Sequence, residues 1–190
     1  MAGKVASSRR PPSCDGPRKF LLAKYFRSSG LSKHEVGLFR VDKTNEIIAE
    51  LKRSYAGEFE TLQNYVAHAV DLAGTRQEMV RVSLEASISE KLRNVRRLAL
   101  RINLLGGRVP GSLELSRAQN YLQPAPERPD VLMVIHGILH ASEAAIARYE
   151  TIIAATEGND YLTQDLLIDL LAQERDHHKL FSSLLENMDV

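Results

Sequence analysis

The sequence contains a single cysteine, Cys14, and no apolar run long enough to cross a membrane. One cysteine cannot build an internal disulfide framework, and such cysteine usage is typical of a reducing compartment. The N-terminus lacks the apolar core of a secretory signal. We therefore expect a cytoplasmic protein without a transmembrane segment. At 190 residues, 44% apolar and 26% charged, the chain is long enough to bury the core of a single domain.

The net charge of +1 conceals a strong asymmetry along the chain. Residues 1–41 hold nine Lys and Arg against two Asp and Glu, whereas the remainder holds sixteen against twenty-two. Pro and Gly interrupt this N-terminal segment, which has little hydrophobic periodicity. We therefore divide the chain into a basic N-terminal arm, residues 1–41, and an acidic body, residues 42–190. Such an arm is suited to docking on an acidic protein or on nucleic acid, and the alternative is an inert extension.

The body shows helical hydrophobic periodicity almost throughout, with apolar residues recurring every three or four positions. Breaks at Gly74, at Gly106-Gly107 and at Gly158 divide it. The pattern predicts four long helices, over about 43–73, 75–105, from Asp130 to the break at Gly158, and 162–185. Thr75 and Glu78 have the spacing of a capping box at the start of the second helix.

The lengths of the connections predict how the four helices are joined. The first and last links are only a few residues long, so each joins an antiparallel hairpin. The middle link, about 106–129, is long enough to return along the bundle, which would make the second and third helices parallel. We expect an all-α four-helix bundle of two hairpins joined by one long crossover.

Charged residues occupy positions on the apolar faces of these helices. Glu174 and His177 interrupt the inward stripe of the last helix, Glu58 that of the first, and Lys91 that of the second. Glu174 and His177 are three residues apart, so both side chains can reach one ion. An unpaired buried charge is costly, so each of these residues requires a partner inside the bundle.

Several motifs together resemble bacterioferritins and Dps-like ferritins over about residues 43–187. Each motif alone is weak, but their combination is specific. The motifs are Glu58-x6-Tyr65-x2-His68-Ala69, Arg101-Ile102-x2-Leu105-Gly106-Gly107-x2-Pro110, Ala145-Ile146-x2-Tyr149, and Glu174-x2-His177. The resemblance implies a ferritin-like bundle whose members bind two irons with one Glu from each of two helices and a Glu-x-x-His from each of the other two. The resemblance to Dps proteins also implies a short amphipathic helix over Ser112–Tyr121 in the crossover.

Only part of this ligand set is present. The resemblance places Glu58, Glu174 and His177 at metal positions. The remaining ligand positions hold Lys91, Asn94 and Ser142, and Leu92 stands where bacterioferritins carry the haem methionine. The ammonium of Lys91 could replace metal by pairing with Glu58 and Glu174, and Asn94 could bond to His177. A remaining single-metal site would use Glu58, Glu174 and His177, with Asn94 and Glu143 as further candidates.

These substitutions leave two functional hypotheses. The first is a bacterioferritin/Dps-type protein related to iron binding and storage that has lost its own dinuclear ferroxidase centre. The alternative is a non-catalytic structural or docking subunit that assembles through the bundle surface and the N-terminal arm. We expect no cofactor or a single iron, no intact di-iron centre, no haem, and a homo- or hetero-oligomer. The incomplete ligands favour a protein that is not an enzyme.

Overall fold

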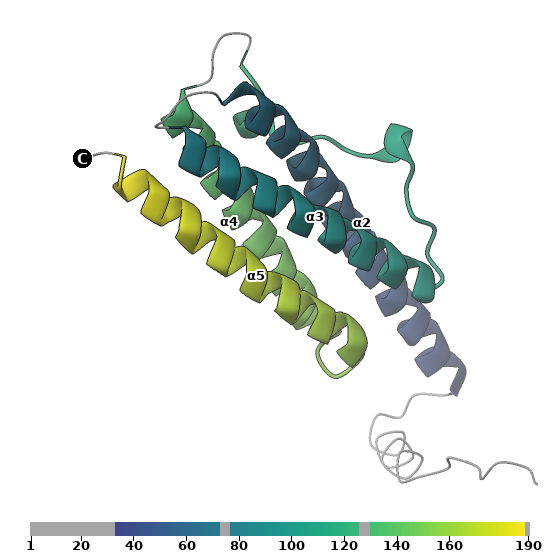
Figure 1. Ribbon diagram of the computed structural model, residues 1–190. Helices are drawn as coiled ribbons and strands as arrows, with labels where there is room; N and C mark the ends of the chain where they lie inside the picture. The colour runs from purple at the N-terminus through teal and green to yellow at the C-terminus, as the bar shows by residue number, and fades with distance from the viewer. Residues whose placement is uncertain (1–32, 73–76, 126–129, 189–190) are drawn as a thin grey trace, which may run out of the picture. The chain divides into compact units, whose positions relative to one another are not determined.

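The computed structural model describes residues 33–72, 77–125 and 130–188, with side chains from residue 43 onward. It contains four long helices, and no strand occurs in these ranges (Figure 1). The helices are α2 Lys33–Asp71, α3 Glu78–Leu104, α4 Val131–Thr156 and α5 Tyr161–Glu186. The prediction of an all-α four-helix bundle is confirmed.

Two apolar clusters fill the core at different levels along the helices. The first contains Tyr65, Leu84, Ile138 and Phe181, and the second contains Leu51, Leu98, Ile152 and Leu170. Chain order through the clusters gives each helix its direction. Helices α3 and α4 both run from the first cluster to the second, and α2 and α5 run the opposite way. The second and third bundle helices are therefore parallel, as the long crossover predicted.

The helix ends follow capping rules where the chain is described. Asp130 caps α4 by accepting a hydrogen bond from the Leu132 amide at 3.0 Å, and Asp160 caps α5 through the Thr163 amide at 3.1 Å. Gly106 and Gly158 adopt φ values of 83° and 70°, which favour glycine after a helix C-terminus.

The predicted start of the second helix is wrong. Helix α3 begins at Glu78 with Gln77 as its N-cap, and the Gln77 side chain forms no capping hydrogen bond. Glu78 is therefore the first helical residue, whereas a capping box needs it at the third. Thr75 and the predicted break at Gly74 lie outside the described residues.

The first helix begins earlier than predicted. Helix α2 starts at Lys33, about ten residues before the expected position, so the last part of the proposed basic arm is helical. By its contacts the chain divides between Asp42 and Lys43, and the bundle belongs to the second unit, Lys43–Val190. The sequence pattern missed this extension because residues 33–42 carry no clear apolar stripe.

The crossover contains two short 3₁₀ turns, Ser112–Glu114 and Asn120–Leu122, where we expected one amphipathic helix. Its second half is fixed to α2 by hydrogen bonds. The buried carboxylate of Glu60 accepts from the Ala118 and Gln119 amides at 3.0 Å each. Further along α2, His68 Nε2 lies 3.1 Å from the Leu122 carbonyl oxygen. Backbone groups that a continuous helix would satisfy internally are satisfied here by α2.

Helix α4 is the one described helix that is long and apolar enough, by composition, to cross a membrane. The expectation that no such segment exists therefore needs a correction. Ten of its residues are buried in the structure, including Ile135, Ile138, Tyr149 and Ile152. Packing against the other helices accounts for part of its apolar composition, whereas apolar residues such as Met133, 70% exposed, lie on its outer face.

Candidate functional site

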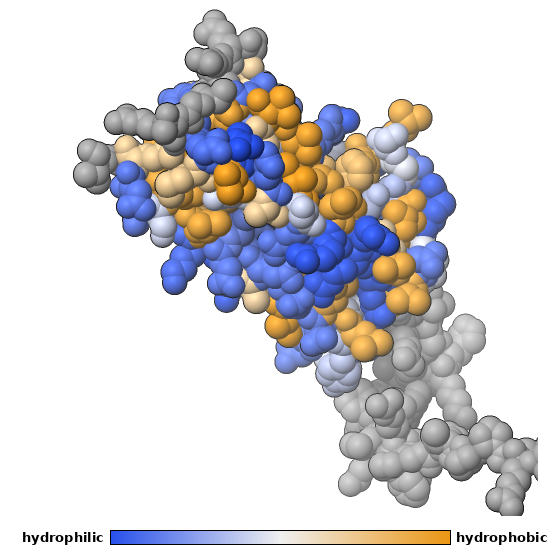
Figure 2. Space-filling view, in the orientation of Figure 1, coloured by the Kyte–Doolittle hydropathy of each residue, from blue (hydrophilic) through white to orange (hydrophobic). Residues whose placement is uncertain are grey.

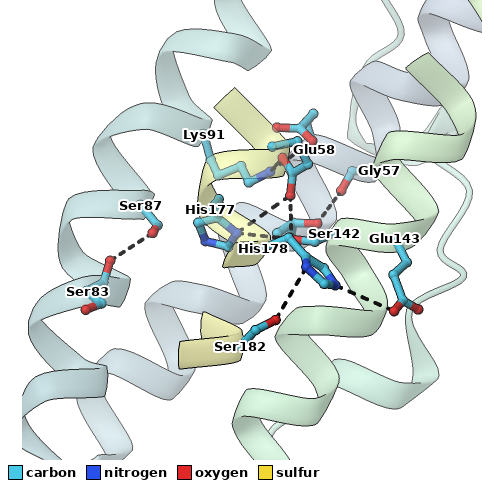
Figure 3. A network of polar contacts seen from close by, with 12 residues as sticks. Gly57, Glu58, Ser83, Ser87, Lys91, Ser142, Glu143, His177, His178 and Ser182 are labelled. Atoms are coloured by element: carbon cyan, nitrogen blue, oxygen red, sulfur yellow. Dashed lines mark hydrogen bonds and ion pairs between the residues drawn. The ribbon is translucent and has the colours of Figure 1, made fainter. Parts of the chain in front are cut away.

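A layer of polar side chains separates the two apolar clusters of the bundle. Each helix contributes to it: Glu58 from α2, Lys91 from α3, Ser142 from α4, and Glu174 with His177 from α5 (Figure 3). All five residues are buried, with exposed fractions of 0–7%. Burial in this layer means that each charge must be balanced by its neighbours, because water cannot do so.

Lys91 is the cation of the layer. Its Nζ lies 3.2 Å from Glu58 Oε1 and also forms an ion pair with Glu174 Oε2. One ammonium thus bridges two carboxylates that come from helices far apart in the sequence. An ammonium group has three donors, and two of them are used here.

Ser142 joins the ion pair to the imidazole of His177. Its hydroxyl donates to Glu174 Oε1 at 2.7 Å and lies 3.0 Å from His177 Nδ1. A hydroxyl has a single proton, so Ser142 must accept at its second contact. His177 therefore carries its proton on Nδ1, and its Nε2 presents an unshared electron pair. No hydrogen-bond partner lies at this Nε2 within the described residues.

The charges and burial shift the pKa values of the layer in different directions. Burial raises the pKa of Glu58 despite the opposing effect of Lys91. Burial also tends to raise the pKa of Glu174, but Lys91, His177 and Ser142 together hold this pKa below its usual range. Burial alone would lower the pKa of Lys91, but the two carboxylates raise it. Lys91 is therefore a permanent cation at neutral pH, facing a firmly ionised Glu174.

His177 is held in its neutral form. Burial lowers the pKa of His177 to about 4, although the charge of Glu174 raises this pKa by a smaller amount. Its ring stacks on Tyr65 with a centroid distance of 5.8 Å and contacts Phe181 at 4.7 Å. Apolar rings on its faces and a hydroxyl at Nδ1 thus fix both the orientation and the charge of this imidazole.

Two buried tyrosines, Tyr65 and Tyr149, flank the layer. Burial raises the pKa of both Tyr65 and Tyr149, and the nearby Glu58 and Glu174 charges raise it further. The Tyr149 hydroxyl faces Glu58, although no hydrogen bond of standard geometry joins them, and Glu58 Oε2 has no partner among the described residues. Both phenols therefore stay protonated at neutral pH beside an anionic layer.

Some candidate ligands lie outside the layer. Glu143, considered as a further ligand, is exposed and lies 3.6 Å from His178 on the surface. It follows Ser142 directly, so the helix turns its side chain about 100° away from the core. Asn94 is buried, but its Oδ1 has no partner, so the expected bond to His177 is not made. Leu92, at the haem position, is half exposed.

The sequence did not single out Glu60 or assign a hydrogen bond to Ser142. Glu60 lies outside the inward stripe of α2, so its burial arises only because the crossover covers it. Ser142 was considered only as a missing ligand, and its role as a link between Glu174 and His177 depends on tertiary geometry. In the described part of the chain, no group of three or more His, Cys, Asp or Glu side chains is arranged to hold a metal ion.

Comparison with known proteins gives a consistent result. The family model of the ferritin-like domain matches residues 48–190. A DNA protection during starvation protein from Pyrococcus furiosus is 28% identical over 145 residues, which cover 74% of this chain and 77% of the relative.

Solved structures share the fold at lower identity. A ferritin-like diiron-carboxylate protein from Bacillus anthracis has a TM-score of 0.67 at 23% identity, covering 75% of this chain and 97% of the other. A dodecameric thioferritin from Bacteroides fragilis has a TM-score of 0.70 at 23% identity, and the match covers 77% of this chain and 88% of the thioferritin. The order of the helices, the parallel α3 and α4, and the match over most of the body together place this chain in the ferritin-like family.

Proposed function

We propose that this protein is a ferritin-like subunit related to iron binding and storage whose own dinuclear ferroxidase centre is replaced by the Lys91 ion pair. The observation that carries the proposal is the position of Lys91 Nζ, in contact with both Glu58 and Glu174. These carboxylates correspond to ligand positions of the family resemblance. A cation already bound between them opposes the binding of a second cation.

The residues present do not fit two metal ions. Three of the six positions hold Lys91, Asn94 and Ser142, which provide an ammonium, a neutral amide and a hydroxyl. The ammonium supplies electrostatically what divalent ions supply to a carboxylate cluster, namely compensation of buried negative charge. Unlike iron, it has no accessible redox state. The layer is then structural, and iron would be cargo of an assembly rather than a substrate of this site.

A single iron held by Glu58, Glu174 and His177 is the competing state of the same layer. It requires Lys91 to leave its present position, because the ammonium occupies the space facing both carboxylates. It also requires His177 to turn away from Ser142 or to coordinate through Nε2. Moving Lys91 breaks its two buried contacts with Glu58 and Glu174, so the ion pair is favoured.

Anaerobic titration of the purified full-length protein with Fe²⁺, followed by oxygen, tests the proposal. We expect no fast oxidation phase with a stoichiometry of two irons per chain. Rapid oxidation of two irons per chain, lost when Glu58 and Glu174 are replaced by Gln, would overturn it. We expect slow iron uptake without the fast oxidation phase, because the assembly would hold iron although this chain has no dinuclear centre.

The alternative is a non-catalytic subunit that acts by assembly and docking. Two observations favour it: the excess of basic residues over 1–41, and exposed apolar side chains on α3, including Leu100 and Leu104, which are 63% and 74% exposed. Figure 2 shows apolar and hydrophilic patches side by side on one face of the molecule. Such patches are typical of surfaces that other subunits cover. Size measurement of the native protein, alone and with co-expressed ferritin-like proteins, separates the two functions.

A further inference from the structure

The crossover is attached to α2 at two places, and between them it is longer than the stretch of helix that it follows. At one end Gly107 packs closely on Ile48, where an added Cβ would lie 2.8 Å from Ile48 Cγ2. At the other end Glu60 accepts from the Ala118 amide at 3.0 Å. The helix from Ile48 to Glu60 is about 18 Å long. The crossover from Gly107 to Ala118 reaches roughly 36 Å when extended, so it must bow away from α2.

The bow leaves a hollow between the crossover and α2. Figure 1 shows the segment around η1, Ser112–Glu114, standing apart from the four helices. The hollow has a volume of about 220 Å³, which is room for several water molecules. Its walls come from the middle of α2 and from the crossover, so it is separate from the buried Lys91 layer. A small molecule can enter here without displacing a side chain from the core.

The α2 wall of the hollow is basic. Lys52 and Arg53 both line it, and Arg53 is paired with Glu50 on the surface of the helix. Glu114 lines the opposite wall, but its carboxylate is already held by Arg108 through hydrogen bonds of 3.0 and 2.5 Å. The charge of Lys52 also acts on Glu114, yet Lys52 forms no ion pair with any residue that the structure describes. The ammonium of Lys52 is therefore free to bind an anion.

The rest of the lining selects among anions. Ala56, Pro110 and Leu115 provide apolar walls, and Ser116 provides a hydroxyl that can donate to a carboxylate oxygen. An apolar group gains free energy by leaving water for such walls. A fully polar anion would leave these walls without a partner, and a neutral apolar molecule would leave the ammonium without one. A ligand that satisfies both has a compact apolar body and one negative group.

We propose that the hollow between α2 and the crossover binds a small amphipathic monocarboxylate, with its carboxylate on Lys52 and Ser116 and its apolar body against Ala56, Pro110 and Leu115. A hydrogen bond between an ammonium and a carboxylate is charge-assisted and therefore one of the stronger polar contacts. The hollow is open to solvent and the ligand is small, so we expect a Kd on the order of 1 mM. The site goes beyond the function proposed above, because it uses no residue of the polar layer.

Saturation-transfer NMR of the full-length protein with sodium benzoate as the probe tests the site, since the method does not depend on the size of the assembly. Benzyl alcohol keeps the ring and lacks the charge, whereas inorganic phosphate keeps a charge and lacks the ring. We expect each of them to bind at least about tenfold more weakly than benzoate, because each loses one of the two kinds of contact. Equal binding of benzoate and either of these two compounds would overturn the proposed ligand class.

Variants at Lys52 place the binding in this hollow. Lys52→Gln removes the charge at a half-buried position and should weaken benzoate binding at least about tenfold without disturbing the fold. Lys52→Arg keeps the charge and should retain binding. Lys179→Gln, at an exposed position on α5, is the matched control and should leave the affinity unchanged. Equal affinity in the wild type and Lys52→Gln would overturn the site.

Hydrogen exchange measured by mass spectrometry gives a second readout. A ligand that contacts both walls fastens the middle of the crossover to α2, so benzoate should slow exchange over residues 110–117 in the wild type and not in Lys52→Gln. Exchange in the centre of α3 should be unchanged. No slowing at about ten times the expected Kd would overturn the proposal. None of these results depends on iron, so failure here leaves the proposed function untouched.

Discussion

Lys91 Nζ lies 3.2 Å from Glu58 Oε1, and this contact joins the middle of α3 to the middle of α2 inside the bundle. The same ammonium pairs with Glu174 on α5. Three helices thus meet at one buried cation. Removing any one of these three charged groups leaves a buried charge without its partner, which is costly.

Removing the cation should destabilise the fold strongly. Lys91→Met leaves two buried carboxylates uncompensated, and breaking a buried pair costs about 3–5 kcal/mol. Chemical denaturation should show this loss, whereas Arg93→Met, at an exposed position two residues away, should change stability by less than about 0.5 kcal/mol. Adding Glu58→Gln and Glu174→Gln to Lys91→Met should restore much of the loss. An unchanged unfolding midpoint for Lys91→Met would show that the ion pair contributes no net stability.

Restoring the family ligands should alter metal chemistry. The triple variant Lys91→Glu, Asn94→His and Ser142→Glu supplies the missing ligand types at the three divergent positions. We expect it to bind two Fe²⁺ ions per chain and to consume oxygen rapidly, whereas the wild type does not. The matched control, Lys91→Gln with Asn94→His and Ser142→Glu, removes the cation but leaves one ligand missing. Equal oxygen uptake by wild type and triple variant would contradict the placement of helices α3 and α4 against the family pattern.

Acid should destabilise the protein partly through His177. Its pKa is about 4 in the folded state against 6.5 for the unperturbed group. The unfolded chain therefore binds a proton between these values that the folded chain does not, and stability falls as the pH drops from about 6.5 to 4. The full shift corresponds to about 3 kcal/mol.

The measurement is the free energy of unfolding against pH for the wild type and His177→Gln. In the variant, the free energy of unfolding should fall less steeply between about pH 6.5 and 4. The variant should also be less stable than the wild type at neutral pH. His136→Gln, at an exposed position on α4, should keep the wild-type slope. A His177 resonance that titrates near 6.5 would refute the neutral, buried imidazole.

Glu60 should control the order of the crossover more than the global fold. Glu60→Gln replaces a carboxylate that accepts from two backbone amides with a neutral amide that can accept only through its oxygen. Hydrogen bonds to a charged group contribute about 1.5–3 kcal/mol, so part of this is lost. Hydrogen exchange should rise at the Ala118 and Gln119 amides while the centre of α3 stays protected. Uniform loss of protection would instead mean that the crossover and the bundle unfold together.

The basic arm should serve docking without supporting the bundle. Deleting residues 1–32, which precede α2, should leave helicity and melting temperature nearly unchanged. It should weaken binding to DNA or to an acidic protein, with an effect that fades as salt rises. A variant with Phe20, Leu22 and Phe26 changed to Ser keeps the charge and tests whether apolar residues anchor the arm. Aggregation of the truncated protein would show that the arm covers part of the body.

The sequence by itself determined the helices and their order, because a periodic apolar stripe needs only local information. Glycine breaks and connection lengths then restricted the topology to two hairpins and a crossover. The spacing of Glu174 and His177 also indicated a polar layer, since charges on an inward stripe must find partners. The inward position of Lys91 followed from the same periodicity between Ile88 and Val95.

The remaining features depend on contacts between segments far apart in the chain. Periodicity cannot show that Ser142 donates to Glu174 and thereby fixes the tautomer of His177, because that depends on the distance between α4 and α5. Likewise, Glu143 and Ser142 are adjacent in sequence, yet only the packing decides that one is at the surface and the other in the core. The burial of Glu60 arises only when the crossover packs on α2, because tertiary structure sets which atoms water can reach.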